Sequence, residues 1–95
     1  MKSSFVYILN CADKTFYTGI TSNLNQRIKD HISGKDPKSY TSKRRPVKLV
    51  FYCEFTDIQL AIAKEKQIKK WSRSKKIALI NNQFDDLKNL ARKEF

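Results

Sequence analysis

The strongest constraint on the fold comes from two short tyrosine-bearing runs that lie close together near the start of the chain. Residues 5–9 read FVYIL and residues 16–20 read FYTGI. Both runs are rich in β-branched and aromatic residues, which favour strands. The polar residues 11–15 between them are typical of a turn. The two runs therefore predict a hairpin.

Side chains alternate between the two faces of a strand. Tyr7 is therefore expected on one face of its strand with Phe5 and Leu9, and Tyr17 on one face of its own strand with Gly19 and Thr21. Gly19 is one of two glycines in the chain. A glycine inside a strand indicates that a backbone or a ligand approaches closely there. We therefore expect Gly19 to have a spacing role at the site.

The segment after the hairpin has the period of an amphipathic helix. Leu24, Ile28 and Ile32 follow one another at spacings of four, so residues 23–33 predict a helix that Gly34 can end. Arg27 and His31 are also four residues apart and should emerge together at one edge of its buried face. The residues that can cap its first turn are Thr21, Ser22 and Asn23.

The next segments predict an exposed loop and a third strand. Residues 35–46 contain both prolines of the chain and show no periodicity, which indicates a loop. Residues 47–55 read VKLVFYCEF, and their dense apolar content predicts a strand in a central or well-covered position.

Helices are expected over the remainder of the chain. Thr56 followed by Gln59 resembles a capping box and predicts a helix that runs to about residue 70. Ser72 can cap a third helix over residues 73–80. A short amphipathic pattern over residues 84–93 predicts a last helix.

These elements predict a small α/β protein. We expect a three-stranded antiparallel sheet flanked by helices over residues 1–80, followed by a C-terminal helical extension over residues 81–95. The expected core residues are Val6, Ile8, Leu24, Ile28, Leu49, Val50, Phe51, Leu60, Ile62 and Ile68.

The charge of the chain indicates a polyanionic partner. Twenty Lys and Arg residues stand against nine Asp and Glu residues, which gives a net charge of +11 at pH 7. Nucleic acid is the leading partner, and an anionic membrane surface comes second. The sequence contains no apolar stretch long enough to span a membrane, so a cytoplasmic location is expected. The two cysteines and the single histidine indicate neither a zinc site nor a disulfide framework.

Two segments, residues 35–48 and residues 64–76, carry thirteen of the twenty cations. Such clustering favours binding to backbone phosphates, and the alternative is a solvated surface. Tyr40 and Trp71 lie within these segments and could stack on bases, although Trp71 is expected to anchor the core. The proposed phosphate-binding residues are Lys35, Lys38, Lys43, Arg44, Arg45, Lys66, Lys69, Lys70 and Arg73.

Glu65 lies on the apolar side of its predicted helix, between Ala61 and Ile68. A carboxylate in that position needs a partner. The partner could be one of the many lysines, or the carboxylate could bind a hard cation such as Mg²⁺. Taken alone, His31 would be interpreted as an ordinary surface or core histidine. Arg27 alone would be interpreted as a charge on the surface of the helix.

The order of the polar residues along the chain resembles the GIY-YIG nuclease superfamily, and in particular its small stand-alone bacterial class. The resemblance extends from residue 5 to about residue 80. Ile20 stands where the excision-repair nuclease subunit has a catalytic lysine, and Asn81 and Asn82 are the candidates for a downstream asparagine ligand. The matching residues are Tyr7, the Tyr17-Thr18-Gly19 run, Arg27, His31 and Glu65.

This resemblance implies a metal-dependent endonuclease that hydrolyses DNA phosphodiester bonds, in DNA repair or in the processing of unusual DNA structures. It implies that Glu65 holds one divalent ion, Mg²⁺ or Mn²⁺, and that Tyr17 deprotonates the attacking water. Tyr7 would orient the water or the phosphate, Arg27 would clamp the phosphate, and His31 would position it or relay a proton.

The alternatives are a catalytically silent DNA- or RNA-binding module on the same fold and, third, a structural interaction domain. A protein partner could supply specificity.

Overall fold

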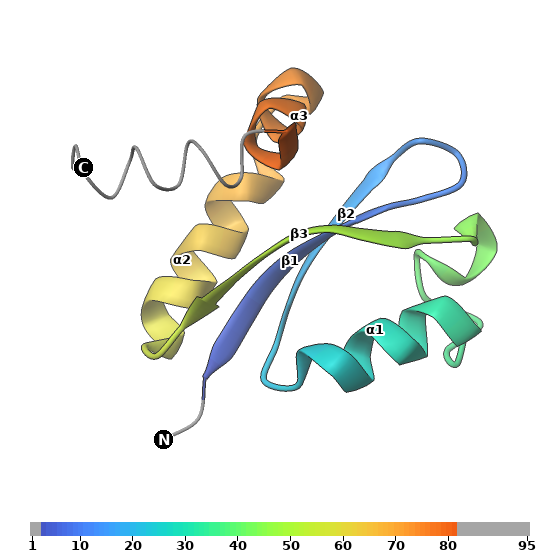
Figure 1. The fold of residues 1–95 in the computed structure, drawn as a ribbon, viewed down its shortest axis with the longest axis horizontal. Helices are drawn as coiled ribbons and strands as arrows, with labels where there is room; N and C mark the ends of the chain where they lie inside the picture. The colour runs from blue at the N-terminus through green and yellow to red at the C-terminus, as the bar shows by residue number, and fades with distance from the viewer. Residues whose placement is uncertain (1–2, 82–95) are drawn as a thin grey trace.

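The computed structural model describes residues 3–81. Three strands, β1 (Ser4–Asn10), β2 (Phe16–Thr21) and β3 (Lys48–Phe55), form one sheet in the order β2-β1-β3. Both neighbouring pairs are antiparallel. The predicted three-stranded antiparallel sheet is therefore confirmed (Figure 1).

The register of the hairpin places both tyrosines on one face of the sheet. Tyr7 lies opposite Gly19, and Leu9 lies opposite Tyr17. Because directly opposed residues share a face, Tyr7 and Tyr17 are diagonal neighbours on the same surface. Their ring centroids are 6.3 Å apart.

The expectation of a central or well-covered third strand is wrong in part, because β3 is an edge strand and β1 is central. The apolar density of β3 has another cause, since helices cover the sheet on both faces. Leu49 packs into the cluster on one face and Phe51 into the cluster on the other. The register shifts between Ile8 and Leu9, where an additional β3 residue, Val50, is accommodated.

Helix α1 (Leu24–Ser33) begins and ends as the sequence predicts. The Asn23 side chain caps it by accepting a hydrogen bond of 3.1 Å from the backbone N–H of Gln26. Gly34 ends it in the left-handed conformation, with φ of 69°. A short 3₁₀ turn, η1 (Ser42–Arg44), interrupts the loop that follows.

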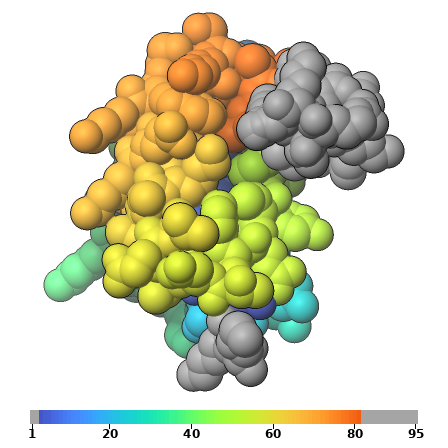
Figure 2. Space-filling model, turned by 90° about the vertical axis from the view of Figure 1, so that its left-hand side faces the viewer, coloured from blue at the N-terminus to red at the C-terminus, as the bar shows by residue number. Residues whose placement is uncertain are grey.

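Helices α2 (Ile58–Lys69) and α3 (Arg73–Asn81) lie across the sheet from α1 (Figure 1). Figure 2 views the molecule from this side, where the surface of α2 continues into that of α3. The predicted cap Thr56 is wrong: the Asp57 side chain accepts a 2.8 Å hydrogen bond from the Gln59 N–H. A carboxylate there also complements the positive end of the helix dipole. Ser72 caps α3, since its Oγ accepts from the Lys75 N–H at 3.2 Å.

Two apolar clusters, one on each face of the sheet, form the core. The first contains Val6, Ile8, Phe51, Ala61 and Ile68, and lies under α2 and α3. The second contains Tyr7, Leu9, Cys11 and Val47, and lies under α1, with Leu24, Ile28 and Leu49 packed against it.

Two apolar positions of the predicted pattern are exposed. Leu60 was expected in the core, but it is 59% exposed because Ala61, the next residue, occupies the buried line of α2. Ile32 belonged to the predicted stripe of α1, but it is 55% exposed. A helix of 3.6 residues per turn brings residue 31 rather than residue 32 back beneath Leu24 and Ile28, so His31 is buried instead.

The predicted last helix, over residues 84–93, lies outside the described residues. Within residues 3–81 no helix has the length and apolar character needed to cross a bilayer.

Candidate active site

A cleft of about 560 Å³ opens between α1, β2 and the loop that leaves α1. Three of the predicted catalytic residues line it: Tyr17 from β2, and Arg27 and His31 from α1. The helical spacing of four places Arg27 and His31 on adjacent turns of one face, as the sequence predicts. The cleft is also lined by Asp30, Lys35, Asp36, Pro37 and Ser39.

Tyr7 lies behind this cleft and is only 2% exposed. Its Oη atom is 2.9 Å from His31 Nε2. Gly19 makes room for the ring, because a Cβ atom at that position would lie 2.4 Å from Tyr7 Oη and 2.6 Å from Tyr7 Cζ. The expected close approach at Gly19 is therefore observed, and the group that approaches is the Tyr7 phenol.

His31 is held from its other ring nitrogen by a residue that sequence reasoning missed. Nδ1 lies 2.7 Å from Thr41 Oγ1, and Thr41 is 1% exposed. Thr41 belongs to the loop that was predicted to be exposed, and nothing in its sequence context indicates burial. Tyr7, His31 and Thr41 thus form a buried polar chain beneath the cleft.

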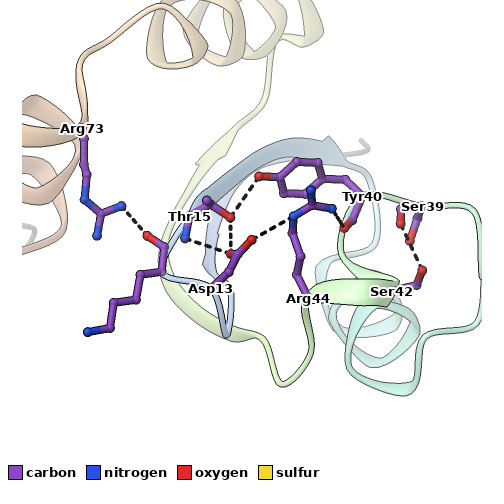
Figure 3. A network of polar contacts seen from close by, with 8 residues as sticks. Asp13, Thr15, Ser39, Tyr40, Ser42, Arg44 and Arg73 are labelled. Atoms are coloured by element: carbon purple, nitrogen blue, oxygen red, sulfur yellow. Dashed lines mark hydrogen bonds and ion pairs between the residues drawn. The ribbon is translucent and has the colours of Figure 1, made fainter.

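A second set of contacts ties this loop to the hairpin turn (Figure 3). The Tyr40 ring stacks on Tyr17 with centroids 5.8 Å apart, and its hydroxyl donates a 2.9 Å hydrogen bond to Thr15 Oγ1. The Arg44 guanidinium lies 3.9 Å from the centre of the Tyr40 ring and forms a 3.0 Å ion pair with Asp13. Tyr40 was a candidate for stacking on bases, but its ring already packs against Tyr17.

The environment keeps Tyr7 and His31, the two titratable groups of the buried polar chain, neutral at pH 7. Burial raises the pKa of Tyr7, and the nearby Tyr17 and Glu65 add to this increase while Arg27 opposes it. Burial also lowers the pKa of His31, and Arg27 lowers it further against a smaller opposing effect of Asp30. The field of the Arg27 guanidinium therefore reaches both rings.

Glu65 approaches this region from α2. Its side chain is 12% exposed and forms a 2.6 Å ion pair with Lys69, one turn along the helix. The hydrogen bond to Glu65 and the charge of its carboxylate raise the pKa of Lys69 against the opposing effect of burial. Glu65 does not line the cleft, but its charge contributes to the raised pKa of Tyr7.

Residues 3–78 match the model of the GIY-YIG catalytic domain. The chain belongs to the GIY-YIG family. It is 48% identical to a UPF0213 protein of Syntrophus aciditrophicus over 80 residues, which are 84% of this chain and 92% of the relative. A UPF0213 protein of Clostridium perfringens is 46% identical over 79 residues, 83% of this chain and 84% of that protein.

The fold of this GIY-YIG domain also matches solved structures. The solution NMR structure of a UPF0213 protein from Bacillus halodurans aligns with a TM-score of 0.58 and 36% identity, over 97% of each chain. A solution NMR structure from E. faecalis aligns with a TM-score of 0.55 and 28% identity, over 100% of this chain and 93% of that one. The names of these relatives assign no activity, so the nuclease class comes from the family.

The cations proposed to bind phosphate divide into two groups in the GIY-YIG domain. The three arginines of this set form contacts within the protein. Arg44 forms the ion pair with Asp13. Arg45 donates 3.0 Å hydrogen bonds to the carbonyls of Ser42 and Ser33. Arg73 donates to the Lys14 carbonyl and lies over the Phe16 ring.

The lysines of the same set are less engaged. Lys69 is paired with Glu65, and Lys35 is 4.0 Å from Asp30. The lysines without an ion pair to any residue in the described range 3–81 are Lys38, Lys43, Lys66 and Lys70.

Proposed function

We propose that this GIY-YIG domain is a metal-dependent endonuclease that hydrolyses DNA phosphodiester bonds. The observation that carries the proposal is the cleft in which Tyr17, Arg27 and His31 converge, with Tyr7 hydrogen-bonded behind them. Phosphodiester hydrolysis requires activation of a water molecule and neutralisation of the charge that develops on the phosphate. The residues of this cleft supply groups for both requirements.

The two tyrosines have different roles in this proposal. Tyr17 lines the cleft and is the phenol that a substrate and its attacking water can reach, so as the phenolate, after losing its own proton to solvent, it accepts the proton of that water. Tyr7 is buried and its raised pKa keeps it neutral, so it orients His31 rather than the water or the phosphate.

Arg27 binds the phosphate. Its guanidinium is charged at all relevant pH values and can donate two hydrogen bonds to phosphate oxygens. It lies on the exposed side of α1 and lines the cleft, so a backbone phosphate can reach it without any rearrangement of the core. The net charge of +11 attracts DNA to the protein as a whole.

The donor set fits a hydrated divalent cation. Residues 3–81 contain no cluster of three or more His, Cys, Asp or Glu side chains that could enclose a metal ion. Mg²⁺ needs no such cluster, because it binds through one or two carboxylates and completes its shell with water and phosphate. Glu65 is the carboxylate that would hold the ion, after Lys69 releases the Glu65 oxygen with which it is paired. The bound ion would neutralise charge on the phosphate and the leaving oxygen.

The test is incubation of the protein with labelled single-stranded, duplex, branched and damaged DNA and with RNA, in Mg²⁺, Mn²⁺ or EDTA. Cleavage only with metal is expected. Glu65→Ala should abolish cleavage while affinity for DNA stays equal or rises slightly, since a negative charge near the phosphate is removed. Glu54→Ala is the matched control, because Glu54 is an exposed carboxylate on β3. Normal cleavage by Glu65→Ala would refute the role of Glu65.

One observation favours a second candidate, a DNA- or RNA-binding module without catalytic activity. The Glu65 carboxylate already has a partner in Lys69, as a purely structural ion pair would. This candidate predicts binding without cleavage in every metal. It also predicts that Glu65→Ala lowers the stability of the protein and leaves its nucleic-acid chemistry unchanged.

The cellular role that best suits an endonuclease of this kind is DNA repair or the processing of unusual DNA structures. A protein partner could supply the choice of substrate, since the cleft contains no side-chain arrangement that indicates base readout. The panel of DNA structures and RNA tests this role, because the nucleic acid that is cut fastest indicates the class of natural substrate.

A further inference from the structure

The loop after α1 contributes a buried hydroxyl to the polar chain beneath the cleft. Thr41 is 1% exposed, although it lies in a segment that is otherwise largely exposed. Its Oγ1 contacts His31 Nδ1 at 2.7 Å and Ser39 Oγ at 3.4 Å. A neutral imidazole carries its proton on one nitrogen, and the partner of that nitrogen selects the tautomer.

The direction of the hydrogen bonds follows from Tyr7. Among the described residues His31 Nε2 is the only hydrogen-bond partner of the buried Tyr7 hydroxyl. A buried O–H group needs a hydrogen-bond acceptor, and an unprotonated ring nitrogen accepts a hydrogen bond well. Nε2 is then unprotonated, and Nδ1–H donates to Thr41 Oγ1. The Thr41 hydroxyl can in turn donate to Ser39.

We infer that Thr41 is a positioning residue that accepts the Nδ1–H of His31 and so stabilises the tautomer in which Nε2 accepts the hydrogen bond of Tyr7. This inference deepens the proposed function, because it assigns a residue that orients the His31 and Tyr7 pair behind Tyr17. Thr41 acts only through His31 and touches neither the substrate nor the cleft.

The structure holds Thr41 in place from both sides. The ion pair of Arg44 with Asp13 and the backbone hydrogen bond from Ala12 N–H to the Arg44 carbonyl, at 2.8 Å, join the loop to the hairpin turn. Arg45 joins the loop to the end of α1 through the Ser33 carbonyl, at 3.0 Å. Because these anchors follow Thr41 within four residues, the hydroxyl is fixed relative to both β1 and α1.

The single histidine of the chain allows a direct test. In untagged, uniformly ¹⁵N-labelled protein, the imidazole gives one set of ring-nitrogen signals, and these distinguish the two neutral tautomers without any activity assay. The wild-type spectrum should show Nδ1 protonated and Nε2 unprotonated. A wild-type protein with Nε2 protonated would overturn the inference, whatever the variants do.

Two variants separate the hydroxyl from the shape of the side chain. Thr41→Val removes the hydroxyl and keeps the branched shape, and we expect a mixture of tautomers or the Nε2–H form. Thr41→Ser keeps the hydroxyl and should retain the wild-type tautomer. If Thr41→Val folds and keeps the wild-type tautomer, Thr41 does not select it. If Thr41→Val does not fold, Thr41→Ala, which also removes the hydroxyl, takes its place with the same expected result.

An activity measurement completes the test. Thr41→Val should lower kcat by about 10- to 100-fold with little change in KM, and Thr41→Ser should restore most of it. Its pH profile should also shift relative to wild type, because the imidazole loses a partner. The titratable groups that face His31 or share its cleft are the same in both variants, namely Tyr7, Tyr17, Arg27, Asp30, Lys35 and Asp36.

The activity measurement and the ring-nitrogen spectrum test the proposed nuclease and the role of Thr41 separately. A wild-type protein that cuts no nucleic acid would refute the proposed nuclease, whereas the ring-nitrogen spectrum would still report whether Thr41 sets the tautomer. Active enzyme in which Thr41→Val matches wild type in tautomer, kcat and pH profile would refute the role of Thr41 alone.

Discussion

Gly19→Ala should strongly destabilise the protein, because Gly19 provides the space that Tyr7 occupies. The added Cβ would lie 2.4 Å from Tyr7 Oη, whereas ordinary contacts begin at 3.4 Å. The phenol oxygen would have to move by about 1 Å. Tyr7 is 2% exposed and its Oη lies 2.9 Å from His31 Nε2, so this shift takes the hydroxyl away from its hydrogen-bond partner.

The expected magnitude combines three effects. Overpacking of a filled core costs about 1–3 kcal/mol, and a buried hydroxyl without its partner costs about 1–3 kcal/mol. Replacement of glycine by alanine restricts the unfolded chain, which returns about 0.4–1 kcal/mol because the φ angle of Gly19 is not positive. The free energy of unfolding should therefore fall by about 1–5 kcal/mol, and Tm should fall by about 4 °C or more.

Urea denaturation measures this change, followed by far-UV circular dichroism and by the fluorescence of Trp71, the single tryptophan. The Tyr7→Phe background is the control for the hydroxyl, because it removes the 2.4 Å contact and the hydrogen bond but keeps Cζ, 2.6 Å from the added Cβ. Gly19→Ala should cost at least about 1 kcal/mol less in that background. A cost below about 0.5 kcal/mol in the wild-type protein would refute the steric explanation. Equal costs in both backgrounds would show that the Tyr7 hydroxyl contributes nothing to it.

Two further predictions concern charge. The pKa of His31 is lowered from 6.5 in the folded protein, so the unfolded chain binds more protons and stability should fall as pH decreases from about 7 towards 5. His31→Gln should remove this slope, since the chain has no other histidine, and a slope that persists would show that another group is responsible. The second prediction is that Lys38→Ala with Lys43→Ala reduces the salt dependence of duplex binding by up to about 0.9 per lost phosphate contact. An unchanged slope would show that neither lysine contacts the backbone.

The sequence predicts those features of the fold that depend on local patterns. Alternation in the two tyrosine runs predicts the hairpin and the neighbours that share a face with each tyrosine, and the observed register then brings Tyr7 and Tyr17 onto one face. The spacing of four predicts that Arg27 and His31 emerge together, and both line the cleft. The burial of Glu65 on α2 follows from its apolar neighbours, and of the two partners that the sequence leaves open, a lysine or a cation, the lysine is present as Lys69.

Features that depend on distant parts of the chain could not be predicted in this way. The central position of β1 rather than β3 is set by which strands pair, and a single strand pattern does not encode it. Thr41 is buried only because the loop folds back on α1, and no period in its sequence signals this. Tyr40 meets Tyr17 for the same reason, although 23 positions separate the two residues in the chain.

The loop of residues 35–46 therefore has two structural roles that its basic composition does not indicate. It packs Tyr40 against Tyr17 and places Thr41 against His31. Its arginines were expected to bind phosphate, yet Arg44 and Arg45 anchor the loop through Asp13 and through backbone carbonyls. Replacing both by alanine would release Tyr40 and Thr41 as well as remove charge, so any loss of DNA binding would have two causes. Lys38 and Lys43 lack such anchoring contacts to the described residues, and their replacement tests the charge of the loop alone.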